Sequence, residues 1–271
     1  MDESNILLAI GLTVFAGLST GIGSLFAFFT KRTNTKFLSV SLGFSAGVMI
    51  YVSLVEIFVK AKDALVEAQG EQLGYWLTLG GFFSGILLIA IIDKFIPKSK
   101  NPHEVKKIED VQNVSSLELD QDRLMKMGLF TALAIAIHNF PEGIATFLSV
   151  INDPSIGIAV AIAVAIHNIP EGIAVAIPIF YATGNRLKAF KWSFLSGLSE
   201  PLGAILAFLL LMPFITDTLF GFIFAAVAGI MVFISIDELL PAAKKYDETH
   251  SSVYGFVLGM AVMGISLVLL S

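Results

Sequence analysis

The residues best suited to chemistry in this sequence belong to a hexapeptide, His-Asn-Phe/Ile-Pro-Glu-Gly, that occurs twice. The copies span residues 138–143 and 167–172, and each lies within an apolar run long enough to cross a bilayer. In a helix, a His and a Glu four residues apart share one face and lie one turn apart. Because ionisable side chains are costly in hydrocarbon, such an intramembrane pair indicates a functional site.

The side chains of the two hexapeptides are typical ligands of divalent metal ions. Imidazole together with carboxylate suits zinc, iron and manganese, whereas sites made only of oxygen suit magnesium and calcium. If the hexapeptides lie on facing helices, they supply a four-ligand site. Its ligands would be His138, Glu142, His167 and Glu171. The two glutamates could also bridge to a second ion. The coordination of that second ion would be completed by Asn139, Asn168 and Glu200.

The same polar residues could instead serve only as hydrogen-bonding contacts between two helices. A central carboxylate costs about 2.5–3.5 kcal/mol on insertion scales, so three of them would cost about 8–10 kcal/mol without giving function in return. The hexapeptides also interrupt their own helices, because Pro141 and Pro170 cannot donate a hydrogen bond to the carbonyl four residues earlier. Backbone of this kind is tolerated at membrane depth only when it is buried or lines a cavity. These arguments favour a metal site.

Several further residues are weaker candidates. Met49 could offer a thioether ligand, although Met within membrane helices usually fills space in the packing. Glu56 lies near a helix end, and we expect it to act at the entrance or exit of the site. Asp237 and Glu238 also lie near a helix end, where they could simply meet solvent.

Composition identifies a membrane protein. Of the 271 residues, 56% are hydrophobic and 14% are charged, which excludes an ordinary soluble domain, where about a quarter are charged. The chain has no cysteine, so disulfides, iron–sulfur clusters and thiolate zinc sites are excluded. The net charge of −5 gives no reason to expect nucleic acid binding. The first 30 residues lack the basic region of a secretory signal and are expected to form a first membrane span.

Eight apolar runs predict an all-α, polytopic membrane protein. The expected helices cover 5–30, 37–59, 72–96, 125–151, 156–182, 188–212, 217–239 and 251–270. We expect one transmembrane domain over 1–271, in which 97–124 forms a flexible loop. The two hexapeptides fall on the fourth and fifth helices, which are adjacent and antiparallel and form a central pair.

The distribution of basic residues predicts the orientation of the chain. Of the 17 Lys and Arg residues, only Lys60 and Lys62 fall on one side of the expected membrane, and the others fall on the opposite side. By the positive-inside rule the basic side, with the loop 97–124, is cytoplasmic. Both termini are therefore expected to be extracytoplasmic.

A second internal repeat predicts inverted symmetry. Residues 46–56 in the second expected helix and 228–238 in the seventh share Ala, Gly, Met, Ser and Glu at matching places. The two helices run in opposite directions under the expected topology. Matched sequence in opposite orientation is typical of inverted-repeat transporters, although Ala-Gly patterns also recur in polytopic proteins for packing reasons.

The paired hexapeptides resemble those of the ZIP (Zrt/Irt-like) family of divalent metal transporters, in particular its bacterial ZupT-type branch. The resemblance extends over nearly the whole chain, including Leu42–Met49, Gly197–Glu200 and Asp237–Pro241. It implies uptake of zinc and related divalent cations (iron, manganese, cobalt or cadmium) into the cytoplasm, through an eight-helix fold in the bacterial inner membrane. It also implies a binuclear metal site at the residues named above, with Met49 beside the first ion. The metals are transported substrates, and no catalytic cofactor or nucleic acid partner is expected.

Other functions fit the sequence less well. An intramembrane protease would carry His-Glu-x-x-His, which this chain lacks. A di-iron oxidase would carry Glu-x-x-His, whereas here the order is reversed and the spacing is four. The chain is therefore not expected to be an enzyme. We expect alternating access, while a channel-like metal pore remains open as an alternative. The small-residue helices also permit a homodimer without requiring one.

Overall fold

The computed structural model describes residues 3–29, 35–95, 121–245, 247 and 250–270. Within these residues the chain forms eight long helical segments, several of them built from consecutive elements. The first four segments are α1 (Glu3–Phe29), α2 (Thr35–Tyr51) with η1 (Val52–Ile57) and α3 (Phe58–Gln69), α4 (Glu71–Phe95), and α6 (Gln121–Asn152). The last four are α7 (Pro154–Thr183), α8 (Arg186–Gly197) with α9 (Ser199–Leu206), η2 (Ala207–Leu211) and η3 (Met212–Phe214), α10 (Asp217–Ile234) with η4 (Ser235–Leu239) and α11 (Leu240–Lys245), and α12 (Ser251–Leu270).

The prediction of an all-helical, polytopic membrane protein is confirmed. Seven of the eight segments are long and apolar enough to span a membrane. The remaining segment, α6, carries the first hexapeptide. The expected loop 97–124 lies outside the described residues as far as position 120, and its last four residues already belong to α6.

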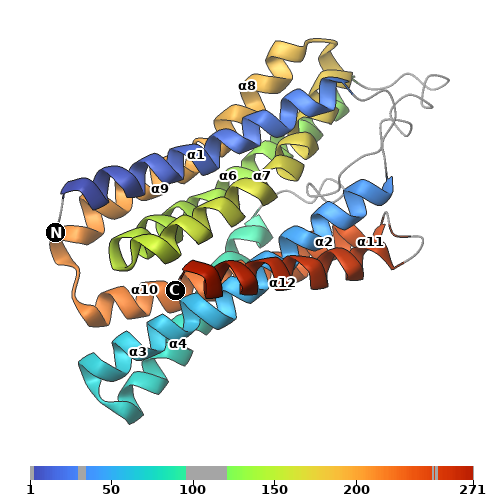
Figure 1. The fold of residues 1–271 in the computed structure, drawn as a ribbon. Helices are drawn as coiled ribbons and strands as arrows, with labels where there is room; N and C mark the ends of the chain where they lie inside the picture. The colour runs from blue at the N-terminus through green and yellow to red at the C-terminus, as the bar shows by residue number, and fades with distance from the viewer. Residues whose placement is uncertain (1–2, 30–34, 96–120, 246, 248–249, 271) are drawn as a thin grey trace.

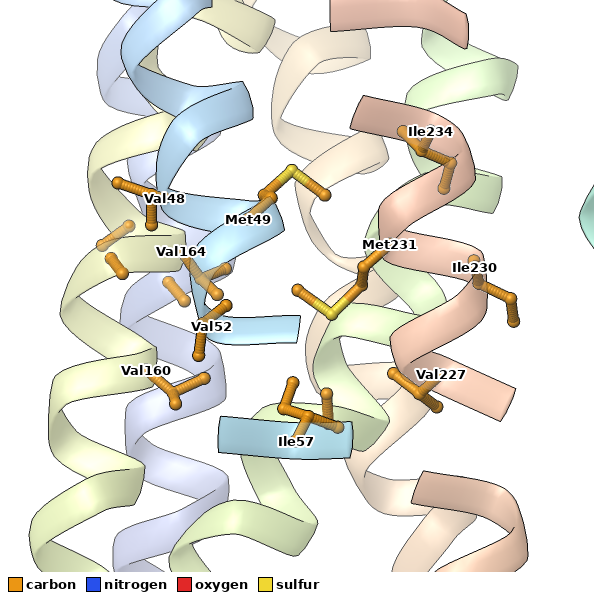
Figure 2. Packing of buried hydrophobic residues seen from close by; sticks show 14 of the residues in the cluster. Val48, Met49, Val52, Ile57, Val160, Val164, Val227, Ile230, Met231 and Ile234 are labelled. Carbon is orange, nitrogen blue, oxygen red and sulfur yellow. The ribbon is translucent and has the colours of Figure 1, made fainter. Parts of the chain in front are cut away.

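The helices form two groups that lie side by side (Figure 1). One group contains α1, α6, α7, α8 and α9. The other contains α2, α3, α4, α10, α11 and α12. A hydrophobic cluster joins the groups, and it includes Val160 and Val164 of α7, Met49 of α2 and Met231 of α10 (Figure 2). The hexapeptide helices therefore share one group, and the repeat of residues 46–56 and 228–238 lies in the other.

The inverted repeat has a clear structural counterpart. In both copies an α-helix changes to a π-helix at matching places, in η1 after α2 and in η4 after α10. The copies also pack alike: a Cβ on Gly47 would overlap the carbonyl oxygen of Phe256 in α12, and a Cβ on Gly229 would overlap that of Phe82 in α4. The pair α2–α12 thus corresponds to the pair α10–α4.

Candidate metal centre

The turn between α6 and α7 fixes how the two hexapeptides meet. Asp153 separates the helices, and its Oδ1 accepts hydrogen bonds from the backbone N–H groups of Ser155 (3.0 Å) and Ile156 (3.3 Å). An acidic residue at this position caps the start of α7 and complements its dipole. With only one residue between them, the helices run antiparallel in direct contact, and a Cβ on Gly157 would overlap Val150. The hexapeptides therefore come to lie at the same height.

The four residues predicted as ligands of one ion meet at this height. His138 Nε2 lies 3.3 Å from Glu142 Oε1 and 3.1 Å from Glu171 Oε1. His167 Nε2 lies 3.1 Å from Glu142 Oε2 and 3.9 Å from Glu171 Oε1. Each imidazole thus faces a carboxylate of its own helix and one of the other helix. Two ligands of a tetrahedral zinc ion lie about 3.3 Å apart when each is about 2.0–2.1 Å from the metal. Three of the four observed distances match that spacing, and the distance from His167 to Glu171 is longer.

Burial makes this arrangement costly unless a cation is bound. At most 5% of each of the four residues is exposed. Nitrogen and oxygen atoms of His138, Glu142 and His167 lie within 4.8 Å of one another, as a shared cation requires. Two carboxylates held together in a low-dielectric interior repel each other and lose hydration. A divalent cation between them would offset both costs.

The amide and carboxylate side chains predicted for a second ion lie beside the first group. Asn168 Nδ2 donates to Ala16 O (2.9 Å) and to Glu200 Oε1. Asn139 donates to Glu171 Oε2 (3.1 Å) and to Ile135 O (3.2 Å) once its amide is oriented to satisfy both contacts. All of these polar side chains are buried.

Two buried oxygen atoms outside the His–Glu pairs have no hydrogen-bond partner among the described residues. They are Asn168 Oδ1 and Glu200 Oε2. Buried polar atoms are rarely left unpaired, because each one loses its hydration without compensation. Oxygen atoms of carboxylates and amides are good ligands for divalent cations. The cluster therefore has unused ligands beyond the His–Glu pairs.

The weaker candidates lie outside the cluster, and Glu238 is close enough to His138 and Glu171 for electrostatic interaction. Met49 is buried in the hydrophobic cluster, where its side chain and that of Met231 point into the space between α2 and α10 (Figure 2). Glu56 is partly buried in η1 and forms an ion pair with Lys60 (Oε1–Nζ 3.5 Å). Asp237 is exposed and Glu238 is half-buried, both in η4. The matched positions of Glu56 and Glu238 follow from the internal repeat.

The glycine of each hexapeptide brings a second helix against the site. A Cβ on Gly143 would overlap the carbonyl oxygen of Glu200 in α9, and a Cβ on Gly172 would overlap that of Thr20 in α1. Reciprocal contacts follow one turn away, where Gly203 of α9 meets Phe140 O and Gly23 of α1 meets Ile169 O. Close backbone contact through small residues is typical of membrane helices. It places Glu200 directly beside the first hexapeptide.

These contacts reveal a relation that the sequence reasoning missed. The segment Gly17-Leu-Ser-Thr20 of α1 matches Gly197-Leu-Ser-Glu200 at the end of α8 and the start of α9, and each is followed three residues later by a glycine. Gly17 and Gly197 also contact each other, each near the carbonyl oxygen of the other. Thr20 therefore occupies the position that corresponds to Glu200. The shared Gly-Leu-Ser was the signal that could have extended the repeat to α1 and α8.

Comparison with known proteins gives a consistent result. The family model described as "ZIP Zinc transporter" matches residues 97–267. The chain is 75% identical over 268 residues to the zinc transporter ZupT of Lysinibacillus sphaericus, covering 99% of both chains. It is 70% identical to the zinc transporter ZupT of Oceanobacillus iheyensis, over 98% of this chain and 99% of that protein. The zinc transporter ZupT of Streptococcus mutans is 60% identical over the same shares.

Proposed function

The chain belongs to the ZIP zinc transporter family, in its bacterial ZupT branch, and on this basis we propose that it carries zinc across the bacterial inner membrane into the cytoplasm. It is a multi-pass membrane protein of a transporter family and not an enzyme. The observation that best supports zinc as the substrate is the crossed arrangement of two imidazoles and two carboxylates, buried between two membrane helices. We further propose alternating access, in which the site opens to one side of the membrane at a time.

The primary test is metal uptake into proteoliposomes that contain the purified protein. Zn²⁺, Fe²⁺ and Mn²⁺ would be offered separately to the wild type and to the His138→Ala and Glu171→Ala variants. We expect saturable zinc uptake by the wild type and its loss in both variants, because each removes a ligand from the proposed site. Counterflow of labelled zinc would distinguish a carrier from a pore. Normal uptake by both folded variants would contradict the proposal.

We propose that iron, manganese, cobalt and cadmium use the same site. Mixed nitrogen and oxygen ligands bind all of these ions, and affinity order alone does not determine which one is transported. Competition with labelled zinc uptake measures the range. An ion that is itself taken up without inhibiting zinc uptake would contradict a shared site.

We also propose a binuclear site, in which Glu142 and Glu171 bridge to a second ion held by Asn139, Asn168 and Glu200. The unpaired oxygens of Asn168 and Glu200 support this proposal. The charge of the cluster supports it too, because three carboxylates exceed the charge of one divalent cation. Met49 belongs to the proposal as a neighbour of the first ion, on the grounds of the family resemblance.

Metal stoichiometry provides a prediction for the second ion. We expect Glu200→Gln to lower bound zinc from two ions per chain to one, because the first ion keeps both imidazoles and both bridging carboxylates. Equilibrium dialysis followed by elemental analysis measures the ratio. The control is Glu71→Gln, which changes an exposed carboxylate at the start of α4 and should leave two ions bound. A wild-type ratio of one would contradict the binuclear proposal.

The proposed orientation places both termini outside the cytoplasm, and the lack of cysteine makes it simple to test. Gln72→Cys, in the connection between α3 and α4, should react with a membrane-impermeant maleimide in intact cells. Lys188→Cys, after the turn between α7 and α8, should react only after permeabilisation. Both positions are exposed, so a difference in labelling between them reports the side of the membrane on which each lies. The native chain provides the unlabelled background, and the reverse labelling pattern would contradict the orientation.

A homodimer is compatible with this function. Light scattering of the purified protein, corrected for detergent, measures the oligomeric state directly. The proposed site is built entirely from one chain, so transport does not depend on the result.

A further inference from the structure

A cavity opens between the two helix groups. Its volume is about 680 Å³, and its walls come from α4, α6, α9 and α10. Leu88 and Ile92 form the wall on α4, and Pro141 forms part of the wall on α6. About half of the surface of Leu88 and of Leu202 is exposed, so the cavity opens sideways. It is large enough for a small-molecule ligand, which occupies about 300–1,000 Å³ in typical sites.

The walls offer almost no polar surface. Two lining residues, Ser84 and Ser199, carry polar side chains. The Ser84 hydroxyl donates to Gly81 O (2.7 Å), and the Ser199 hydroxyl donates to Ser196 O (2.6 Å), so each is already paired with its own helix. A buried water needs two to four polar partners, so these almost wholly apolar walls suit an apolar occupant.

The position of the cavity within the membrane identifies that occupant. The lining residues of α4 fall between Ser84 and Ile92 of the span Glu71–Lys94, and those of α10 fall between Phe222 and Ile230 of the span Asp217–Leu239. The α10 stretch covers the middle of its span, and the α4 stretch runs from near the middle of its span to two residues before its end. The cavity therefore lies largely within the hydrocarbon layer of a bilayer. We propose that the cavity binds the acyl chain of a membrane lipid, inserted sideways between the two helix groups.

The bound acyl chain would contact α6 and α9, two of the helices that carry residues of the candidate metal centre. Ile137 and Pro141 line the cavity and belong to the two turns that carry His138 and Glu142. Ser199 lines it next to Glu200. On the opposite wall the acyl chain would pack on α4 and α10, so it would fill the cavity between the two helix groups. The acyl chain therefore supports the packing behind the candidate metal centre, and its fit tunes the rate of transport. Only this last effect rests on the proposed function.

Photocrosslinking tests the binding without measuring transport. The purified protein would be reconstituted with phosphatidylglycerol that carries a diazirine near the end of one acyl chain, and labelled residues would be mapped by mass spectrometry. We expect labelling of Leu88 and Ile92 to exceed that of Leu87 several-fold. Leu87 is exposed on the same helix but does not line the cavity. Equal labelling of Leu87 and Leu88 in the wild type would overturn the proposal.

Two cavity-filling variants make the test specific. Ala226→Phe and Ala136→Phe each place a ring in the cavity and should remove the excess labelling of Leu88. The control is Gly80→Phe, which adds the same ring to the face of α4 where a Cβ would meet open space, and which should leave the labelling unchanged. Either folded cavity variant is sufficient for the comparison. Undiminished labelling in a folded variant would overturn the proposal. If transport fails in the wild type while the labelling holds, the binding site stands and the proposed function falls.

Discussion

Glu142→Gln is expected to abolish saturable zinc uptake and to weaken zinc binding by at least about 100-fold. Substitution of a residue that only hydrogen-bonds to a metal ligand already lowers metal affinity by up to about 100-fold, and Glu142 is itself a proposed ligand. Glu142 lies within 3.3 Å of both imidazoles, one from each oxygen, whereas Glu171 approaches His167 only to 3.9 Å. It is thus the carboxylate that joins the two halves of the site. Glutamine keeps its size and one acceptor oxygen but removes the negative charge.

Stability measurements separate loss of the site from loss of the fold. Ligand binding stabilises the native state by about 2.7 kcal/mol at a concentration 100 times the dissociation constant. We therefore expect zinc to raise the thermal unfolding temperature of the wild type but not that of Glu142→Gln. The metal-free unfolding temperature of each protein provides the reference for its own zinc-dependent shift. Glu67→Gln, an exposed change in α3, should behave as the wild type. A zinc-dependent shift of wild-type size in Glu142→Gln would exclude this carboxylate as a ligand.

Gly172→Ala is expected to destabilise the protein by about 1–3 kcal/mol, as inserting a methyl group into a well-packed interior does, and to remove most transport. The added methyl would overlap the carbonyl oxygen of Thr20, so α1 and α7 must separate. All of the proposed ligands remain in the sequence. The expected loss of transport therefore comes from the changed position of α7.

Gly80→Ala is the matched control for this substitution. Gly80 is exposed on α4 and a Cβ there would meet nothing within 4 Å. Alanine is favoured over glycine in a helix by about 0.5–1 kcal/mol, so this variant should be slightly more stable than the wild type and should transport normally. Thermal unfolding in detergent and zinc uptake measure both effects. If Gly172→Ala were as stable and active as Gly80→Ala, the backbone contact between α1 and α7 would not matter for function.

The positions of the helices were largely predictable because hydrophobic length is a strong signal in membrane proteins. The central pair followed from the two hexapeptides. The extension of the second segment to Gln69 was missed, because polar residues such as Lys62 and Glu67 ended the apolar run at residue 59 while the helix continued. A criterion based on hydrophobicity detects the part of a helix in lipid and not the part in water.

The local geometry was harder to predict. The π-helices η1 and η4 depend on hydrogen-bond register, which residue type does not determine, although their matched positions reflect the repeat. The neighbourhood of Glu200 depends on a glycine contact between α6 and α9, two helices separated in sequence by α7 and α8. The surroundings of Met49 likewise depend on tertiary packing. Spacing within one helix predicted which side chains share a face, but not which faces meet.

The glycine contacts around the hexapeptides have a consequence for how this protein can evolve. Gly23, Gly143, Gly172 and Gly203 meet backbone oxygens, and these contacts involve no side chain of a proposed ligand. The distances between helices are therefore set separately from the residues that would bind the metal. Exchange of a ligand between His, Asn, Asp and Glu leaves this frame intact, whereas exchange of a glycine disrupts it whatever the ligands are. Selection can thus alter the cation preference of such a chain through few substitutions, on a backbone arrangement that stays fixed.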